Sequence, residues 1–112
     1  MTKRTSRQTG AVRGSRSGRP IMVLLDLLGR RWTLRILWEL REGRRLTSRE
    51  LRTACDEASP TVLQARLSEL REGGFLDLAA EGGYSLTPLG HELCETFLPL
   101  HRFAEKWSRM RD

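Results

Sequence analysis

The sequence has few of the features that metal sites, disulfide frameworks and membrane spans require. Its two cysteines, Cys55 and Cys94, stand alone, without C-x-x-C spacing or paired histidines, so we expect buried, unreactive thiols and neither a zinc site nor a disulfide. The longest aliphatic run covers residues 21–25, far short of the roughly 20 residues of a membrane helix. No apolar segment typical of a secretion signal lies near the N-terminus. We therefore expect a cytoplasmic protein that makes no membrane contact and carries no metal or other cofactor.

Patterns that carry catalysis are also missing. The sequence contains no glycine-rich phosphate loop and no grouping of Ser, His and Asp, and its two histidines, His91 and His101, are isolated. An enzyme needs a nucleophile with a base, paired carboxylates or metal ligands. We therefore expect a protein that is not an enzyme.

Basic residues are what the sequence has in excess, and they are unevenly placed. The chain has 112 residues, enough for one domain, and a net charge of +6. Residues 1–20 contain six Lys and Arg and no Asp or Glu, so this segment alone carries +6. Residues 30–52 hold eight Arg against three acidic residues. This excess points to a polyanionic partner.

Residues 1–19 differ in composition from the rest. They are rich in Ser, Thr, Gly and Arg and contain almost no apolar side chains, so they cannot bury enough surface to offset the entropy lost on ordering. We interpret this segment as a disordered basic arm. It either lies along phosphates or in a minor groove of DNA, or it is only a solubilising tail. Residues 20–112 form the folded domain.

Apolar spacings of three and four residues predict four helices between residues 20 and 73. The first covers 20–28 and the second 32–42, each followed by a glycine. A capping box, Thr47-Ser48-Arg49-Glu50, opens a short third helix that reaches about Cys55. Ser59-Pro60 then supplies an N-cap and a first-turn proline for a helix that ends before Gly73. A turn of about three or four residues joins these last two, which is the spacing of a helix-turn-helix.

A hairpin and a long helix complete the pattern. Residues 75–80 and 84–87 alternate in polarity and flank Glu81-Gly82-Gly83, which suits a tight turn. Thr87-Pro88 opens a final helix, in which Pro99 should cause a kink or a split. The predicted fold class is mainly α with a small β-hairpin. It is a winged helix-turn-helix with N- and C-terminal dimerisation helices.

Four stretches of the chain resemble the HxlR family of winged-helix regulators, which is related in architecture to the MarR and PadR families. They read LLGRRWT at 27–33, RELR at 49–52, SPTVLQARL at 59–67 and YSLTPLG at 84–90. The resemblance covers about residues 20–107. It implies a bacterial transcription regulator that binds DNA as a homodimer.

Two features depart from the resembled family. Many members have a cysteine just before the first helix, where this chain reads Gly18-Arg19-Pro20, so thiol sensing by that route is not expected. The family's wing is usually longer and basic, whereas the turn at 79–83 is short and contains Glu81. A strong contact between this wing and the minor groove is therefore not expected either.

The helix that begins at Pro60 is the recognition helix by position, and its first turns should enter the major groove. Its leucines share one face and should be buried, which leaves nearest the groove Thr61, Gln64, Ala65 and Ser68. Gln64 can pair with an adenine edge, and Ala65 can meet a thymine methyl group. Thr61 can bond to a base or a phosphate, and Ser59 either contacts a phosphate or only caps the helix.

Five arginines are candidate phosphate contacts. Arg66 either contacts phosphate or pairs with Glu69 or Glu72. The other four surround the third predicted helix, which crosses the DNA backbone in this kind of docking: Arg44, Arg45, Arg49 and Arg52. Each of these either binds phosphate or is merely solvated.

The first and last helices carry more apolar residues than one small domain can cover. The residues expected at a dimer interface are Ile21, Met22, Leu25, Phe97, Leu100, Phe103 and Trp107, with Leu98 and Met110 beside them. A second copy of the chain would bury them in a symmetric interface and would place two recognition helices about one turn of DNA apart.

These patterns predict a sequence-specific regulator that binds double-stranded DNA as a homodimer at an inverted-repeat operator, and the resemblance implies a repressor. Two alternatives stay open. One is a regulator of the same fold that chiefly senses a small-molecule effector between the last helix and the DNA-binding body. The other is a winged-helix adaptor that binds protein. Affinity that falls steeply with salt would indicate phosphate contacts.

Overall fold

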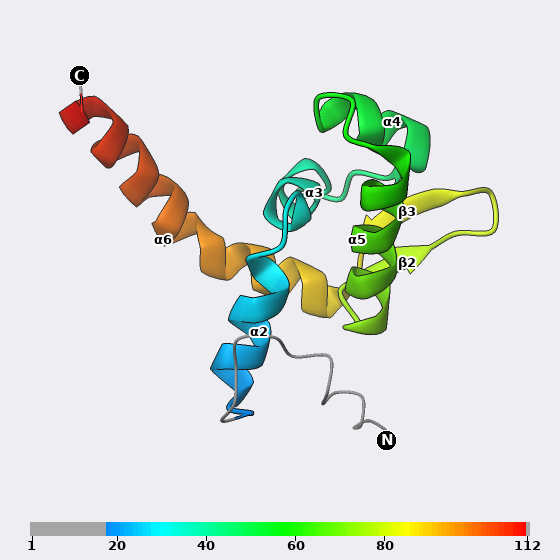
Figure 1. Cartoon of the computed structure of the whole chain (residues 1–112), viewed down its shortest axis with the longest axis horizontal. Helices are drawn as coiled ribbons and strands as arrows, with labels where there is room; N and C mark the ends of the chain where they lie inside the picture. The colour runs from blue at the N-terminus through cyan, green and yellow to red at the C-terminus, as the bar shows by residue number, and fades with distance from the viewer. Residues whose placement is uncertain (1–17, 112) are drawn as a thin grey trace.

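The computed structural model describes residues 18–111, and the predicted basic arm lies outside these residues except for its last two. Its helices are α2 (Pro20–Leu28), α3 (Thr33–Glu39), α4 (Ser48–Ala54), α5 (Pro60–Glu72) and α6 (Pro88–Arg111). Its strands are β1 (Leu46–Thr47), β2 (Leu76–Leu78) and β3 (Gly83–Leu86). In Figure 1, α4 and α5 lie beside the hairpin, and α6 runs away from them. The predicted fold class, mainly helical with a small hairpin, is confirmed.

The helix ends follow the predicted caps except in α3. The Thr47 hydroxyl accepts from the Glu50 amide at 3.1 Å, and the Glu50 carboxylate accepts from the Thr47 amide at 2.8 Å, which completes the capping box of α4. Helix α3 ends at Glu39, three residues before the predicted end. The reason is a turn in which Glu42 and Gly43 take left-handed conformations, with φ of 65° and 76°.

The sheet has one strand more than predicted. Strand β3 lies in the middle and pairs antiparallel with β1 and with β2. Tyr84 on β3 faces Leu46 on β1 and Leu78 on β2. Strand β1 is only two residues long, too short for alternating polarity to reveal it. The wing therefore joins the segment that precedes the helix-turn-helix.

The core lies between α3, α4, α5 and the sheet, and we call residues 33–87 the body. Leu37, Leu51 and Leu67 are completely buried there. The first half of α6 packs closely on the body, because a Cβ atom on Gly90 would lie 2.3 Å from the Phe75 carbonyl oxygen. Only glycine allows this approach of the helix to the residue that precedes β2.

The second half of α6 leaves the body. The helix is continuous through Pro99 and changes direction along its length in Figure 1, so of the two outcomes expected at Pro99 the structure has a kink and not a split. Every residue from 98 to 111 is exposed. None of the helices in residues 18–111 is long and apolar enough to cross a membrane.

Candidate nucleic-acid interface

The outer face of α5 gathers the residues predicted to read bases. Thr61, Gln64, Ala65 and Ser68 line one open depression together with Pro60. The opposite face of the helix is buried through its three leucines, as the spacing predicts. The Ser59 hydroxyl accepts from the Val62 amide at 3.4 Å, so it caps the helix. The structure therefore brings the four predicted base-contacting side chains onto one accessible surface.

Tyr84 is a buried residue that contacts this surface from behind, and the sequence did not reveal this contact. Its hydroxyl accepts a hydrogen bond from the Gln64 side-chain amide at 3.4 Å, while the side chain as a whole is only 4% exposed. The bond links β3 to the recognition helix and restricts where the Gln64 amide can point. The alternation of the hairpin predicts that Tyr84 lies in a strand, but it does not predict which helix the hydroxyl meets.

Among the candidate phosphate contacts, Arg49 is the one whose guanidinium group has no acidic side chain close to it in residues 18–111. It lies with Ser48, Arg52 and Gln64 around a second depression between α4 and α5. Within residues 18–111, no acidic side chain lies within 4 Å of its guanidinium group. An exposed cation without a partner beside the recognition helix is suited to a DNA phosphate.

The other four arginines predicted to contact phosphate already form ion pairs with acidic side chains. The pairs are Arg44–Glu39 at 3.3 Å, Arg45–Glu81 at 3.0 Å, Arg52–Glu57 at 3.5 Å and Arg66–Glu69 at 2.9 Å. The first three arginine side chains are 43–59% exposed, so a phosphate can replace such a weak surface pair. Arg66 is only 19% exposed. Of the two contacts considered for Arg66, the structure has the ion pair.

Two arginines hold the turn between α4 and α5. Arg52 donates from Nε to the Ala58 carbonyl at 3.0 Å, and Arg35 donates to the Ala54 carbonyl. Hydrogen bonding to Glu39 raises the pKa of Arg35 above its ordinary value. The turn needs this support because Asp56 and Glu57 both take left-handed conformations. Arg52 therefore has a structural role that its sequence position did not indicate.

Most residues predicted at a dimer interface are exposed. Ile21 and Leu25 on α2 are 55% and 52% exposed, and Phe103 and Trp107 on α6 are 60% and 52% exposed. Met22 and Leu100 are exposed as well. Phe97 differs, because it is half-buried against the core of its own chain.

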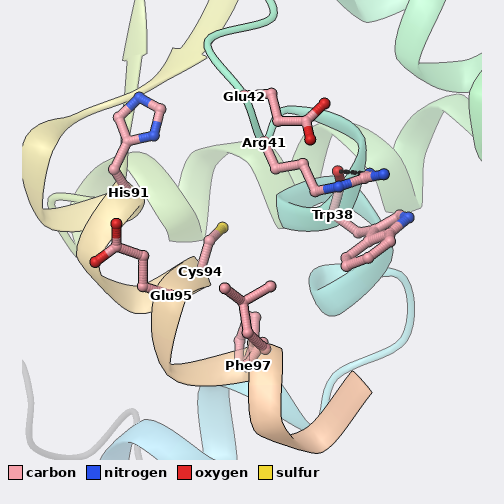
Figure 2. A pocket seen from close by; sticks show the side chains of 8 residues that line it. Trp38, Arg41, Glu42, His91, Cys94, Glu95 and Phe97 are labelled. Carbon is pink, nitrogen blue, oxygen red and sulfur yellow. Dashed lines mark hydrogen bonds between the residues drawn. The ribbon is translucent and has the colours of Figure 1, made fainter. Parts of the chain in front are cut away.

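A cavity of about 290 Å³ lies between α3 and α6. Figure 2 shows Trp38 and Arg41 on one side and His91, Cys94 and Phe97 on the other. The Arg41 guanidinium stacks 3.6 Å from the centre of a Trp38 ring. The Cys94 thiol points toward the Leu37 carbonyl at 3.6 Å, and burial raises its pKa. Such a thiol stays protonated and unreactive at neutral pH.

The two cysteines differ in burial. Cys55 is completely buried, as predicted, and Cys94 is half-buried. Burial also raises the pKa of Cys55. In the part of the chain that the structure describes, no cluster of His, Cys, Asp and Glu could hold a metal ion.

Known proteins match both the sequence and the fold. The family model described as HxlR-like helix-turn-helix matches residues 27–112. The HTH-type transcriptional regulator sll1512 of Synechocystis is 30% identical over 94 residues, which span 79% of this chain and 69% of that protein. The family is one of transcriptional regulators and not of enzymes.

Solved structures show the same architecture. Quinone-bound YodB from B. subtilis aligns with a TM-score of 0.71 and 27% identity, over 79% of this chain and 98% of that one. A possible HxlR family transcriptional factor from Thermoplasma volcanium also gives 0.71, with 26% identity over 81% of this chain and 86% of its own. The fold is shared by a regulator of the MarR family from Porphyromonas gingivalis, which aligns with a TM-score of 0.68. It is 24% identical over 83% of this chain and 96% of its own. This chain belongs to the HxlR family of helix-turn-helix transcriptional regulators.

Proposed function

We propose that this regulator binds double-stranded DNA as a homodimer and reads an inverted repeat, with α5 of each copy in the major groove. The observation that carries the proposal is the exposed face of α5, where Thr61, Gln64, Ala65 and Ser68 line one depression. Arg49, which has no acidic partner within residues 18–111, lies on the adjoining helix. Polar side chains that contact bases, flanked by a cation that contacts phosphate, are the arrangement that specific DNA binding requires.

Each part of the surface has a distinct task in this proposal. Gln64 hydrogen-bonds to an adenine edge, and the tyrosine hydroxyl behind it limits its orientations. Arg49 fixes the body on the backbone, and Arg44 and Arg52 exchange their weak surface pairs for phosphates. Arg45 neutralises Glu81 at the wing turn at 3.0 Å, which removes the repulsion that an acidic wing would meet at DNA.

The proposal extends to repression and to the arm. A dimer bound across an operator that overlaps a promoter excludes polymerase, so we propose a repressor. The six basic residues in 1–20 add phosphate affinity without sequence preference.

The test is selection from a random duplex library, followed by sequencing, at two salt concentrations. We expect an enriched inverted repeat whose half-sites lie about 10 base pairs apart. Gln64→Ala should lose about 1–3 kcal/mol of discrimination at one base position, whereas Ser108→Ala, an uncharged exposed residue far along α6, should not change the selected sequence. Binding without enrichment that disappears on removal of residues 1–19 would leave only non-specific affinity and would contradict the proposal, as would no binding at either salt concentration.

A second candidate function is supported by the cavity between α3 and α6. We propose that a small planar effector enters it, because aromatic and apolar side chains line it together with a few charged ones. YodB was solved with a quinone bound. Calorimetric titration with hydroquinone is the test. Leu98→Trp should fill the cavity and remove the binding heat, while Leu34→Trp on an exposed position elsewhere should keep it. Equal heats from the two variants would contradict this second candidate.

A further inference from the structure

The second half of α6 carries two parallel stripes of side chains. Leu100, Phe103, Trp107 and Met110 recur at spacings of three and four residues, and all are more than half exposed. An isolated helix shorter than about 12–15 residues is only marginally stable in water, and the ring contact of His101 with Trp38 at 4.7 Å leaves these four side chains uncovered. Because so much apolar surface on one helix face is unusual for a monomer, this face needs a cover.

A stripe of charges runs beside the apolar one, and its sign changes along the helix. Glu92 and Glu95 lie in the first half, and Arg102, Lys106 and Arg109 lie in the second. Their spacings of three, four and seven residues put all five on one flank of the helix. All five side chains are exposed, and within residues 18–111 none of them forms an ion pair. The helix is therefore acidic at one end of this flank and basic at the other.

A two-fold axis converts this pattern into complementary contacts. In a symmetric antiparallel pair, one flank of a helix meets the same flank of its partner, which runs in the opposite direction. Glu92 lies as far before the midpoint between residues 100 and 101 as Arg109 lies after it. Glu95 and Lys106 are related in the same way. A parallel pair would instead place glutamates beside glutamates and cations beside cations.

We propose that α6 pairs with α6 of a second copy in an antiparallel register centred between residues 100 and 101. Glu92 then meets Arg109 of the partner subunit, and Glu95 meets Lys106 of the partner subunit. The apolar stripe supplies the affinity, and the charges select the direction and the register. A slip of one helical turn would separate each pair by roughly another 5 Å. This inference rests on the homodimer of the proposed function and names the contacts that determine its geometry.

Charge reversal in the full chain tests the register by sedimentation equilibrium at low and high salt. The two variants are Glu92→Lys/Glu95→Lys and Lys106→Glu/Arg109→Glu, each of which replaces four attractive contacts per dimer with repulsive ones. We expect the dimer dissociation constant to rise about 10- to 100-fold at low salt and less at high salt. The quadruple variant restores opposite charges at every contact and should return to within about threefold of the wild type.

A matched control reverses two acids elsewhere on the surface. Glu72→Lys/Asp77→Lys changes the net charge as much as the first variant does, at exposed positions on α5 and β2, and should leave the dissociation constant unchanged. If neither charge-reversed variant weakens the dimer, or the quadruple variant stays as weak as they are, the register is wrong while the dimer stands. A wild type that is monomeric at every concentration would overturn the homodimer itself and, with it, this part of the proposed function.

Discussion

The body and the second half of α6 contain the same kinds of apolar side chain in opposite environments. In the body, Leu37, Leu51 and Leu67 are completely buried. In the second half of α6, Phe103, Trp107 and Met110 are 60%, 52% and 76% exposed. The core of the body is therefore buried within the described chain, whereas residues 98–111 are all exposed and contact the body through the His101 ring, which lies 4.7 Å from the Trp38 ring. The comparison indicates that stability resides in the body, and under the proposed homodimer we expect assembly to depend on α6.

The largest expected effect comes from removing a buried leucine. Leu67→Ala should lower the free energy of unfolding by about 2–5 kcal/mol at every protein concentration, because the cavity lies inside the body. Phe103→Ala should lower the apparent stability only at concentrations where the wild type is dimeric. Urea unfolding at several concentrations measures both. If both variants lost the same free energy of unfolding at every protein concentration, the body and the second half of α6 would not differ in the way proposed.

The contact of α6 with the body provides the next test. Gly90→Ala places a methyl group 2.3 Å from the Phe75 carbonyl oxygen, and neither backbone can move without opening the core. We expect a loss of about 3 kcal/mol in thermal or urea unfolding. His91→Ala, the exposed neighbour on the same helix, should stay within about 0.5 kcal/mol of the wild type. A tolerated Gly90→Ala would show that the first half of α6 is not anchored to the body.

A smaller effect is expected at the start of α4. Thr47→Ala removes the hydroxyl that accepts from the Glu50 amide and should cost about 1 kcal/mol of folding free energy. Thr53→Ala, an exposed threonine in the same helix, is the matched control and should be nearly neutral. Because the cap lies in the body, the loss should not depend on protein concentration. A concentration-dependent loss would connect α4 to the dimer interface.

The smallest effect is a dependence of stability on pH that arises from Cys55. Burial raises the pKa of this thiol in the folded state, so the unfolded chain ionises first as the pH rises. The stabilising contribution is complete at neutral pH and declines above about pH 8.5. The wild type should therefore lose stability between pH 8 and about 10 more steeply than Cys55→Ala does. Parallel curves would show that the thiol is not held in an apolar environment.

Helix positions were predictable from the sequence because their signals are local. The capping box at Thr47 and the proline at position 60 lie within one helical turn of the residues they organise. Strand β1 and the early end of α3 were not predictable in this way. Strand β1 exists only because Tyr84 brings an edge of the hairpin beside Leu46, and this pairing joins residues far apart in the sequence.

The candidate site shows the same limit. The spacing of the leucines on α5 predicts which face is outward, and Gln64 lies there. The ion-pair partners of the arginines were not predictable, because they depend on which acidic side chains the fold brings near each arginine. Arg45 reaches Glu81 across the sheet, and Arg66 pairs with Glu69, whereas Arg49 finds no acidic partner in residues 18–111. Charge counts along the sequence cannot distinguish these cases.

The most direct test compares the wild type with Phe103→Ala/Trp107→Ala on one selected inverted-repeat duplex, by fluorescence anisotropy together with sedimentation. We expect the variant to keep the helix content of the body, to sediment as a monomer and to bind the duplex about 100-fold more weakly, because two linked half-site contacts become independent. A monomeric variant that binds the inverted repeat as tightly as the wild type would contradict the central claim that α6 assembles the body into a DNA-reading dimer.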